Sequence, residues 1–351
     1  MKYDFDDILL EPAITSPISS RKTIDITYEN GFLPLMTAPM DTVVDKRNYR
    51  IFHHNKINVV LPRNSDTEDV VQVGNTKHYW MSFGSDEFIE LFIANSVRDS
   101  EGTYHVLIDI ANGHMENLLL TVEKAKNKYG GKLVLMVGNV ANPQTYRMLS
   151  NAGADYVRIG IGNGGGCLTT QQTGIGYPMA SLIRETYEVS CELKNPAKIV
   201  ADGGFKKYAD IIKALALGAD YVMLGSIFNK ALESCGETLI DADHIVTKLI
   251  PIDQYNKTTL DKFNMGFKLF KRFRGMSTKE AQKALGNETL KTSEGVSKIQ
   301  KVEYTLQGWT ENFNHYLASA MSYTGCKNLD EFIGKVNFNM ITTNAYNRFN
   351  K

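Results

Sequence analysis

The sequence predicts an α/β fold, a single (β/α)8 TIM barrel with an eight-stranded parallel core, and two observations lead to that prediction. Eight short apolar runs rich in β-branched residues recur along residues 33–225. Between most of them lie segments with apolar residues at helical spacing. Near-continuous apolar strands that alternate with helices indicate a parallel sheet covered on both faces. Eight such units indicate a closed barrel rather than an open sheet.

The predicted strands are read directly from the apolar runs. In chain order they span residues 33–38, 58–61, 79–83, 104–110, 132–140, 156–161, 198–202 and 221–225. Residues 115–129 and 208–217 carry apolar side chains at the i, i+3, i+4 and i+7 positions of a helix. We therefore expect these two segments to be helices that cover the sheet.

Composition excludes several classes of protein. The 351 residues include 39 basic and 39 acidic side chains, a balance that argues against a nucleic-acid binder working through phosphates. Four cysteines are too few for a disulfide-stapled secreted module. The first residues, MKYDFDD, do not resemble a signal peptide, and the uncharged stretch 159–183 holds too many glycines and polar residues to cross a membrane. We expect a cytoplasmic protein that binds neither nucleic acid nor membrane.

In a barrel the active site lies where strands end and loops begin. Here the strand ends are rich in Gly, Asp and Asn, unlike the strands that they follow. They are residues 38–41 (APMD), 109–113 (DIANG), 138–139 (GN), 160–167 (GIGNGGGC), 202–204 (DGG) and 225–226 (GS).

The glycine-rich loop 160–167 ends in Cys167. It matches GxGxxG, but a dinucleotide fingerprint opens a helix at once, whereas residues 168–176 read as a turn and Pro178 is the earliest helix start. The remaining interpretation is a loop whose backbone groups face an ion and which presents a thiol. A thiol at a barrel mouth is a candidate nucleophile; the alternative is an inert structural cysteine.

Two further strand ends predict a phosphate site. Gly203, Gly204, Gly225 and Ser226 follow the seventh and eighth strands, where barrel enzymes bind phosphate. Asp202 is placed to accept hydrogen bonds from sugar hydroxyls, so a ribose phosphate satisfies both features. The alternative is that Gly203-Gly204 only makes a tight turn between a strand and a helix.

Other constellations are less informative. His53 and His54 are adjacent and point in different directions, and no histidine or cysteine shows zinc spacing. Residues 262–274 (KFNMGFKLFKRFR) interleave four phenylalanines with five basic residues. We interpret this run as a solvated face or a bend beside the site, with an anion patch as the alternative.

Taken together, the strand-end motifs resemble those of the IMP dehydrogenase/GMP reductase family over essentially the whole chain. The matching segments are 5–12 (FDDILLEP), 38–43 (APMDTV), 109–113 (DIANG), 138–140 (GNV), 160–178, 201–204 (ADGG), 218–225 (GADYVMLG) and 274–276 (RGM). The resemblance implies one barrel catalytic domain over residues 1–351, which binds a purine 5′-monophosphate and a nicotinamide cofactor. It also implies a cysteine that bonds to purine C2.

Three features resemble the reductase branch of the family. The interval 61–79 is too short for the paired CBS module of most dehydrogenases, and residues 109–113 read DIANG rather than D-A-H-G. The segment after Met276 is short, ends in TSEG and lacks the Arg-Tyr pair of the dehydrogenases. These features imply an NADPH-dependent conversion of GMP to IMP and ammonia. The alternatives are an IMP dehydrogenase without its module, a divergent member acting on a nucleotide such as dGMP, and a non-catalytic nucleotide-binding regulator.

The resemblance also implies roles for single residues. Cys167 is the nucleophile, with Thr169 and Glu294 as its acid/base partners. The implied substrate residues are Asp202, Gly203, Gly204, Gly225, Ser226, Gly275, Met276, Ser277, Ser293 and Gly295. The implied cofactor residues are Asp109, Ile110, Ala111, Asn112, Ile161 and Gly162 at the nicotinamide, and Ser20, Arg21, Ser319 and Ser322 at the adenosine end. A potassium ion is implied at Gly162, Gly164, Cys167 and Thr170, and the assembly is implied to be a homotetramer.

The chain departs from the family pattern at several positions. Asn163, Gly165 and Leu168 stand where the family loop has Pro, Ser and Thr, and Gly165 thereby lacks a hydroxyl that normally touches phosphate. Arg63 lies in a segment that is closer to the dehydrogenases.

Overall fold

The eight predicted strands form one parallel sheet. The computed structural model describes residues 1–63, 79–95, 102–241, 248–284 and 294–349. The strands are β2 (Leu35–Thr37), β3 (Val59–Leu61), β4 (Tyr79–Phe83), β5 (Tyr104–Asp109), β6 (Leu133–Val140), β7 (Tyr156–Ile159), β8 (Lys198–Asp202) and β9 (Tyr221–Leu224). Their order in the sheet is β2-β9-β8-β7-β6-β5-β4-β3, with every neighbouring pair parallel. The predicted barrel is confirmed.

The barrel closes at a seam between β2 and β3. Here side-chain hydrogen bonds replace part of the backbone hydrogen bonding that joins the other neighbouring strands. A parallel bridge joins Met36 to Asn58. The Asn58 side-chain amide donates to the carbonyls of Leu33 and Leu35 at 3.2 and 3.1 Å. On the next residue pair, the Val60 N–H donates to the Thr37 hydroxyl at 2.8 Å. These bonds satisfy buried backbone groups that would otherwise lack partners.

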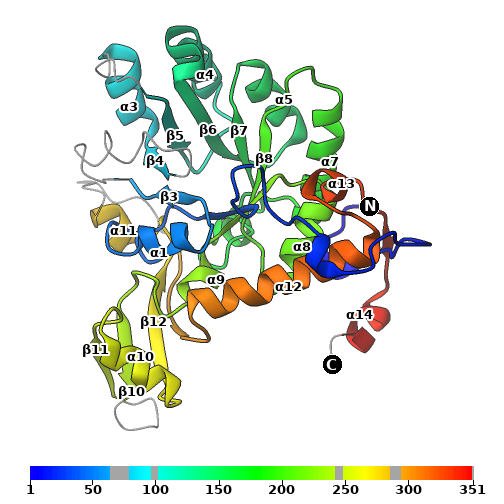
Figure 1. The fold of residues 1–351 in the computed structure, drawn as a ribbon. Coiled ribbons are helices and arrows are strands. Elements are labelled where there is room, and N and C mark those ends of the chain that lie inside the picture. The colour runs from blue at the N-terminus through cyan, green and yellow to red at the C-terminus, as the bar shows by residue number, and fades with distance from the viewer. Residues whose placement is uncertain (64–78, 96–101, 242–247, 285–293, 350–351) are drawn as a thin grey trace.

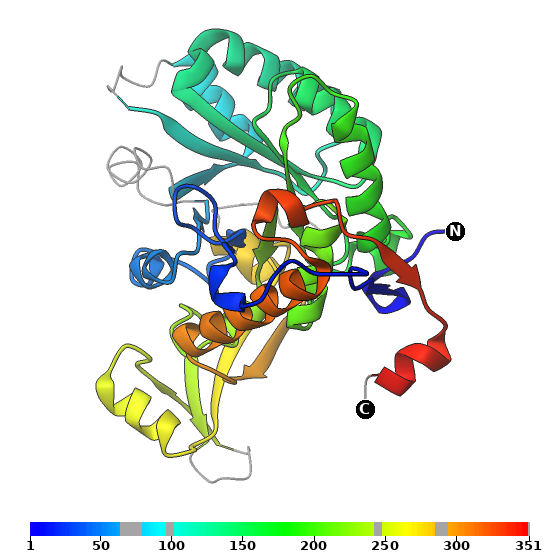
Figure 2. The ribbon, with the colours of Figure 1, turned by 45° about the vertical axis from the view of Figure 1, so that its right-hand side comes forward.

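Helices surround the barrel (Figures 1 and 2). They include α1 (Tyr49–His54), α3 (Ser85–Phe88), α4 (Glu116–Tyr129), α5 (Pro143–Asn151), α7 (Met179–Cys191), α8 (Tyr208–Leu217), α9 (Ser226–Asn229), α12 (Leu306–Thr324) and α13 (Leu329–Phe332). Both helices predicted from periodicity are present, as α4 and α8. Helix α5 begins where the Asn142 side chain accepts from the N–H of Gln144, with Pro143 in the first turn.

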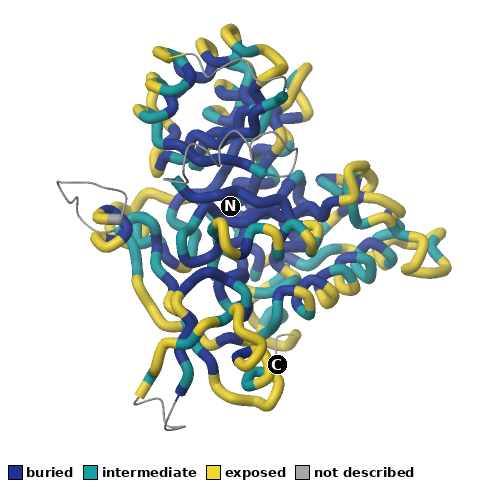
Figure 3. Tube along the Cα trace, turned by 60° about the vertical axis from the view of Figure 1, so that its left-hand side comes forward, coloured by how far each residue is buried: buried dark blue, intermediate teal, exposed yellow. Residues whose placement is uncertain are grey.

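The core has two layers, one on each face of the barrel sheet. The larger layer packs between strands and helices. The smaller layer fills the barrel interior and consists of Met36, Ala38, Val60, Trp80, Leu107, Met136, Val200, Tyr221 and Met223. Figure 3 shows the strands as the buried centre of the molecule. Because the interior is filled, a ligand has to bind at the mouth of the barrel.

An antiparallel sheet that the sequence analysis did not predict extends from the barrel. It has the order β11-β10-β12-β13 and carries helix α10 (Lys257–Asn264). Its strands are β10 (Thr238–Asp241), β11 (Leu249–Ile252), β12 (Leu269–Arg274) and β13 (Ser297–Lys301). The expectation that residues 262–274 form one solvated face or a bend is wrong, because the run is divided between α10 and β12. Within β12, Lys271 is 0% exposed.

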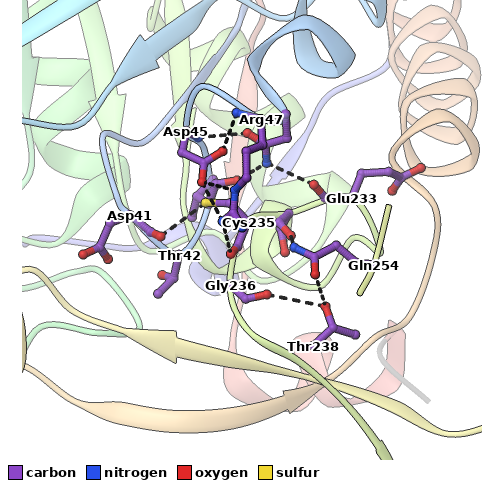
Figure 4. A network of polar contacts seen from close by, with 12 residues as sticks. Asp41, Thr42, Asp45, Arg47, Glu233, Cys235, Gly236, Thr238 and Gln254 are labelled. Atoms are coloured by element: carbon purple, nitrogen blue, oxygen red, sulfur yellow. Dashed lines mark hydrogen bonds and ion pairs between the residues drawn. The ribbon is translucent and has the colours of Figure 1, made fainter. Parts of the chain in front are cut away.

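Hydrogen bonds hold the base of this sheet to the loop that follows β2. The Lys271 ammonium donates to the carbonyls of Ser234 and Gly236 at 2.7 and 3.3 Å. Figure 4 shows the adjoining network, in which the Cys235 thiol donates to the Asp41 carbonyl at 3.2 Å. Arg47 binds the Asp45 carboxylate and reaches the Cys235 carbonyl at 3.3 Å. Burial lowers the pKa of Lys271 to about 7.

The two ends of the chain meet in a small antiparallel pair. Strand β1 (Ile8–Leu10) pairs with β14 (Phe338–Met340), and the short helix α14 (Thr343–Phe349) follows. Figure 2 shows both termini on the same side of the molecule. The Lys213 ammonium on α8 donates to the carbonyl of Phe5 at 2.8 Å, which ties the N-terminal segment to the barrel. Across the described ranges, none of the helices has the length and apolar character needed to span a membrane.

Candidate active site

The segments after β8 and β12 meet the glycine-rich loop 160–167 at the mouth of the barrel. A Cβ built on Gly203 would lie 2.9 Å from the Gly164 nitrogen, so the loop after β8 touches the glycine-rich loop. A Cβ on Gly275 would collide with the carbonyl oxygen of Gly166, which places the segment after β12 on the other side. Only glycine permits this close an approach. The sequence motifs therefore converge on one place.

The structure brings Cys167, Thr169 and Glu294 into one hydrogen-bonded path. The Cys167 thiol donates to the Thr169 hydroxyl at 3.2 Å, and that hydroxyl donates to the Glu294 carboxylate at 2.6 Å. All three residues are half-buried. A thiol, a hydroxyl and a carboxylate in line can move a proton between sulfur and carboxylate.

Backbone hydrogen bonds hold Glu294 beside the cysteine. The Leu168 N–H donates to the Glu294 carbonyl at 2.7 Å, and the Val296 N–H donates to the Gly166 carbonyl at 3.0 Å. An antiparallel bridge pairs Cys167 with Gly295. The thiol and the carboxylate thus lie on two segments that pair like strands.

The residues after Cys167 depart from the expected turn. Residues 169–173 form a short helix, α6 (Thr169–Thr173), whose C-cap is Gly174. Helix α7 then begins after Pro178, as predicted. The prediction of a turn over 168–176 is therefore wrong for the single helical turn that presents Thr169.

A buried arginine joins the predicted substrate and cofactor subsites, and the sequence analysis missed it. The guanidinium of Arg158 on β7 contacts Asp109 at 2.6 Å and Asp202 at 3.0 Å. Burial alone would lower the pKa of Arg158, but the two carboxylates raise it, so the group stays a cation. Asn139 donates to the same Asp202 oxygen at 2.8 Å. The only sign of this arginine in the sequence was that it is the one charged residue within the apolar run YVRIGI.

Asp109 has a second cation beside it. The Arg63 guanidinium lies 3.3 Å from the other Asp109 oxygen, so both carboxylate oxygens face arginine. The loop that follows β5 is joined to strand β6, because the Ile110 N–H donates to the Gly138 carbonyl at 2.9 Å. Ile110 and Ile161 are buried, whereas Ala111 and Asn112 are exposed and open to a ligand.

The predicted phosphate residues lie around one corner of the same mouth. A Cβ on Gly204 would lie 3.5 Å from the Asn163 side chain, and a Cβ on Gly165 would lie 3.7 Å from the Ser226 hydroxyl. A Cβ on Gly225 would lie 2.9 Å from the Met40 sulfur. The glycine-rich loop therefore contacts the ends of both β8 and β9.

The segment expected to line the purine is packed against the cysteine loop. The Gly275 N–H donates to the Val296 carbonyl at 2.9 Å, and the Ser277 carbonyl accepts from Gln282 on α11 (Lys279–Ala284) at 3.0 Å. Met276 between them is half-buried. Ser293, the remaining residue of this expected set, lies outside the described residues.

The residues expected at the adenosine end form a group of their own. The turn that contains Arg21, η2 (Arg21–Thr23), is capped by Ser20 and packs against α12, which carries Ser319 and Ser322. Ser16 donates to the Ser322 carbonyl at 2.7 Å. Within the described ranges, no hydrogen bond or ion pair joins this group to the Asp109 or Cys167 loops.

The expected potassium site can be judged by its donor atoms. Gly162 has a φ of +79°, and a Cβ there would collide with the Thr170 hydroxyl. The Gly164 carbonyl accepts from the Cys167 N–H at 2.9 Å, so it lies on the inner side of this turn. Oxygen donors of this kind fit a hard cation rather than zinc. Among the described residues, no group of three or more His, Cys, Asp or Glu side chains is placed to hold a metal.

Comparisons with known proteins agree with the motifs. A family model described as IMP dehydrogenase / GMP reductase domain matches residues 2–249. The chain is 26% identical to a GMP reductase of Caenorhabditis elegans, with 97% of this chain and 92% of the relative covered. It is 28% identical to a GMP reductase of Oceanobacillus iheyensis (98% and 97% covered) and 27% identical to one of Vibrio campbellii (100% and 98% covered).

Proposed function

The chain belongs to the IMP dehydrogenase / GMP reductase family, and from that premise we propose that it is a GMP reductase, which converts GMP to IMP and ammonia with NADPH. The observation that carries the proposal is the path from the Cys167 thiol through Thr169 to Glu294. This path supplies a nucleophile and a proton carrier beside the residues that are expected to hold the ribose phosphate.

The first step replaces the purine amino group by sulfur. Cys167 loses its proton along the path to Glu294 and adds to C2 of GMP, so that a carbon–sulfur bond forms. Glu294 then returns the proton through Thr169 to the C2 amine, the carbon–nitrogen bond breaks, and ammonia leaves. Asp202, held by Arg158 and Asn139, orients the ribose during this step.

The second step releases the product. The cofactor, when bound, supplies a hydride to C2. The carbon–sulfur bond breaks, IMP leaves, and Cys167 becomes a thiolate that the same path can protonate. The overall reaction consumes one proton besides the hydride, and a second when ammonia leaves as ammonium. Ala111 and Asn112 form the exposed rim at which the nicotinamide would lie, and Arg63 and Arg158 keep Asp109 oriented there.

The remaining parts of the proposal concern the whole protein. We infer one catalytic domain over residues 1–351, cytoplasmic and homotetrameric, that uses a potassium ion at the turn of Gly162, Gly164, Cys167 and Thr170. The adenosine-end group, made of the exposed Ser20–Arg21 and the half-buried Ser319 and Ser322, is proposed as the site for the far half of the cofactor.

One assay tests the activity and its nucleotide preference. NADPH absorbance is followed with GMP and, separately, with dGMP, and IMP or dIMP is identified by chromatography. We expect NADPH oxidation that depends on one of these nucleotides and matches ammonia release. Absence of turnover with both would contradict the assignment as a GMP reductase and favour a non-catalytic nucleotide-binding protein.

A second assay tests the direction of the reaction. The 17 residues between Met276 and Glu294 contain neither arginine nor tyrosine, so the pair that helps the dehydrogenases activate water is missing. Incubation with IMP and NAD⁺ is therefore expected to give no accumulating XMP. Multi-turnover formation of XMP would reassign the protein as a dehydrogenase without the CBS module.

A further inference from the structure

Lys298 and Ser226 face the same space beside the glycine-rich loop. The two residues come from different elements, β13 and α9. A Cβ built on Gly165 would lie 3.6 Å from the Lys298 ammonium nitrogen and 3.7 Å from the Ser226 hydroxyl. A cation and a hydroxyl thus converge on the surface of the loop that carries Cys167.

Lys298 has no acidic partner among the described residues. In the part of the chain that the structure describes, no carboxylate lies within ion-pair distance of its ammonium group. The ammonium nitrogen lies over the ring of Phe273, 5.3 Å from the ring centroid. The neighbouring Lys230 is already paired with Glu303 at 2.9 Å. Lys298 is exposed, and partial desolvation of its ammonium together with the charge of Lys230 lowers its pKa.

The same packing sets the position of Lys298 relative to the reacting thiol. Lys298 pairs with Phe273 across the antiparallel strands β12 and β13. A Cβ on Gly166 would lie 2.9 Å from the Phe273 ring, so this ring packs against the cysteine loop beside Lys298. The distances from Gly165 then place the ammonium group on the Ser226 side of the loop, where the nucleotide phosphate is expected.

We propose that Lys298 binds the 5′-phosphate of the nucleotide, donating to a phosphate oxygen beside the Ser226 hydroxyl. This inference rests on the proposed function, because it names the residue that recognises one part of that substrate. A phosphate dianion matches an ammonium without an acidic partner in the described ranges and a hydroxyl beside it, next to a glycine that leaves room for the phosphate. Lys298 then donates the hydrogen bond to phosphate that a hydroxyl on residue 165 would otherwise make.

The first test compares Lys298→Gln with Lys301→Gln. Lys301 is an exposed lysine of the same strand at an odd spacing, so its side chain lies on the opposite face. Dissociation constants are measured by calorimetry for GMP and for guanosine. We expect Lys298→Gln to weaken GMP binding roughly 10- to 100-fold, as for loss of a charged hydrogen bond, with guanosine binding unchanged. Lys301→Gln is expected to match the wild type for both ligands, and equal GMP affinity in all three proteins would overturn the proposal.

The second test asks whether the side chains of residue 165 and Lys298 bind the same phosphate group. A serine fits at position 165, since its Cβ would meet only ordinary van der Waals contacts. We expect Gly165→Ser to restore part of the GMP affinity lost in Lys298→Gln. A double variant that binds GMP no more tightly than Lys298→Gln would mean that the two positions do not share a phosphate, and would contradict the proposal.

The outcomes separate this inference from the proposed function. A wild-type enzyme that turns over a guanine nucleotide while Lys298→Gln keeps the same KM refutes only the role of Lys298. A wild-type protein with no guanine-nucleotide turnover refutes the proposed function. In that case inorganic phosphate is titrated against wild type and Lys298→Gln, and equal affinities would refute the anion site as well.

Discussion

Cys167 differs from the other cysteines in its hydrogen bond to a hydroxyl that leads to a carboxylate. Burial raises the pKa values of Cys235 and Cys326, so these thiols are poor nucleophiles. We expect Cys167→Ala to keep less than about a hundredth of the wild-type rate, because a nucleophile normally supplies several orders of magnitude. GMP binding, measured by calorimetry, is expected to survive. The exposed Cys191→Ala is the control and should keep full activity; an active Cys167→Ala would refute the nucleophile.

The proton path makes a prediction about Thr169. Thr169→Val removes the hydroxyl that bridges thiol and carboxylate but keeps the shape of the side chain. We expect its kcat for GMP to fall at least about 10-fold, the lower part of the range for losing acid/base assistance. Thr169→Ser, which keeps the hydroxyl, is the matched control. If the valine and serine variants were equally active, the path would not carry the proton.

Glu294→Gln tests the other end of the path. Glutamine keeps the shape but cannot exchange a proton, so ammonia release is expected to slow more than hydride transfer. Quenched-flow analysis of GMP deamination is compared with adduct formation from IMP and NADP⁺. Equal slowing of both half-reactions would assign Glu294 a role in binding instead.

Lys271 predicts a pH dependence of stability. Its pKa is about 7 when folded and near 10.5 when unfolded, so between these values the unfolded chain binds more protons. The free energy of unfolding should therefore rise with pH from about 7 to 10, by at most about 1.4 kcal/mol per pH unit. Urea titrations of wild type and Lys271→Met across this range are compared. The wild type should show the steeper rise; parallel curves would mean that Lys271 stays charged in the fold.

At the scale of single elements, the barrel seam predicts a large effect from one hydroxyl. Thr37→Val leaves the buried Val60 N–H without its acceptor. We expect the free energy of unfolding to fall by about 1–3 kcal/mol, the cost of an unsatisfied buried donor. Thr37→Ser keeps the hydroxyl and should lose less. Urea denaturation measures both, and equal stability of wild type and Thr37→Val would show that the seam does not depend on this bond.

Elements with a strong local pattern were predictable, and elements decided by tertiary contacts were not. The barrel strands are apolar on both faces, which few other structures produce. In strand β12 the side chain of Lys271 is buried. A lysine is usually exposed, so the sequence of this strand looked like that of a solvent-facing segment. Helix α6 (TTQQT) is short and carries β-branched residues with weak helix propensity.

The candidate site divides in the same way. The glycine-rich loop and Cys167 stood out from the residues alone. Glu294 joins Thr169 across 125 residues, and only the family resemblance connected them. Arg158 was missed because a charge inside a strand becomes meaningful only when the carboxylates of two other strands are seen beside it.

At the scale of the whole molecule, the pairing of the chain ends predicts how truncation acts. Removing residues 337–351 takes away β14 and leaves the edge of β1 unpaired. We expect a melting midpoint at least about 2 °C below that of the full chain. Removing only residues 343–351 keeps β14 and is the control. Indistinguishable midpoints for the full chain and the longer deletion, measured by calorimetry, would show that the pair adds nothing to stability.

Arg158 has a consequence for how the two ligands affect each other. One guanidinium holds Asp202, which is expected to bind the ribose of the nucleotide, and Asp109, which is expected to lie at the nicotinamide of the cofactor. A ligand that shifts one carboxylate also changes the ion pair between Arg158 and the other carboxylate. We therefore expect the binding of nucleotide and the binding of cofactor to be coupled. Coupling of this kind is reciprocal: the factor by which nucleotide changes the cofactor dissociation constant equals the factor in the reverse direction. The order of addition then changes how fast the ternary complex forms, but not how much of it is present at equilibrium.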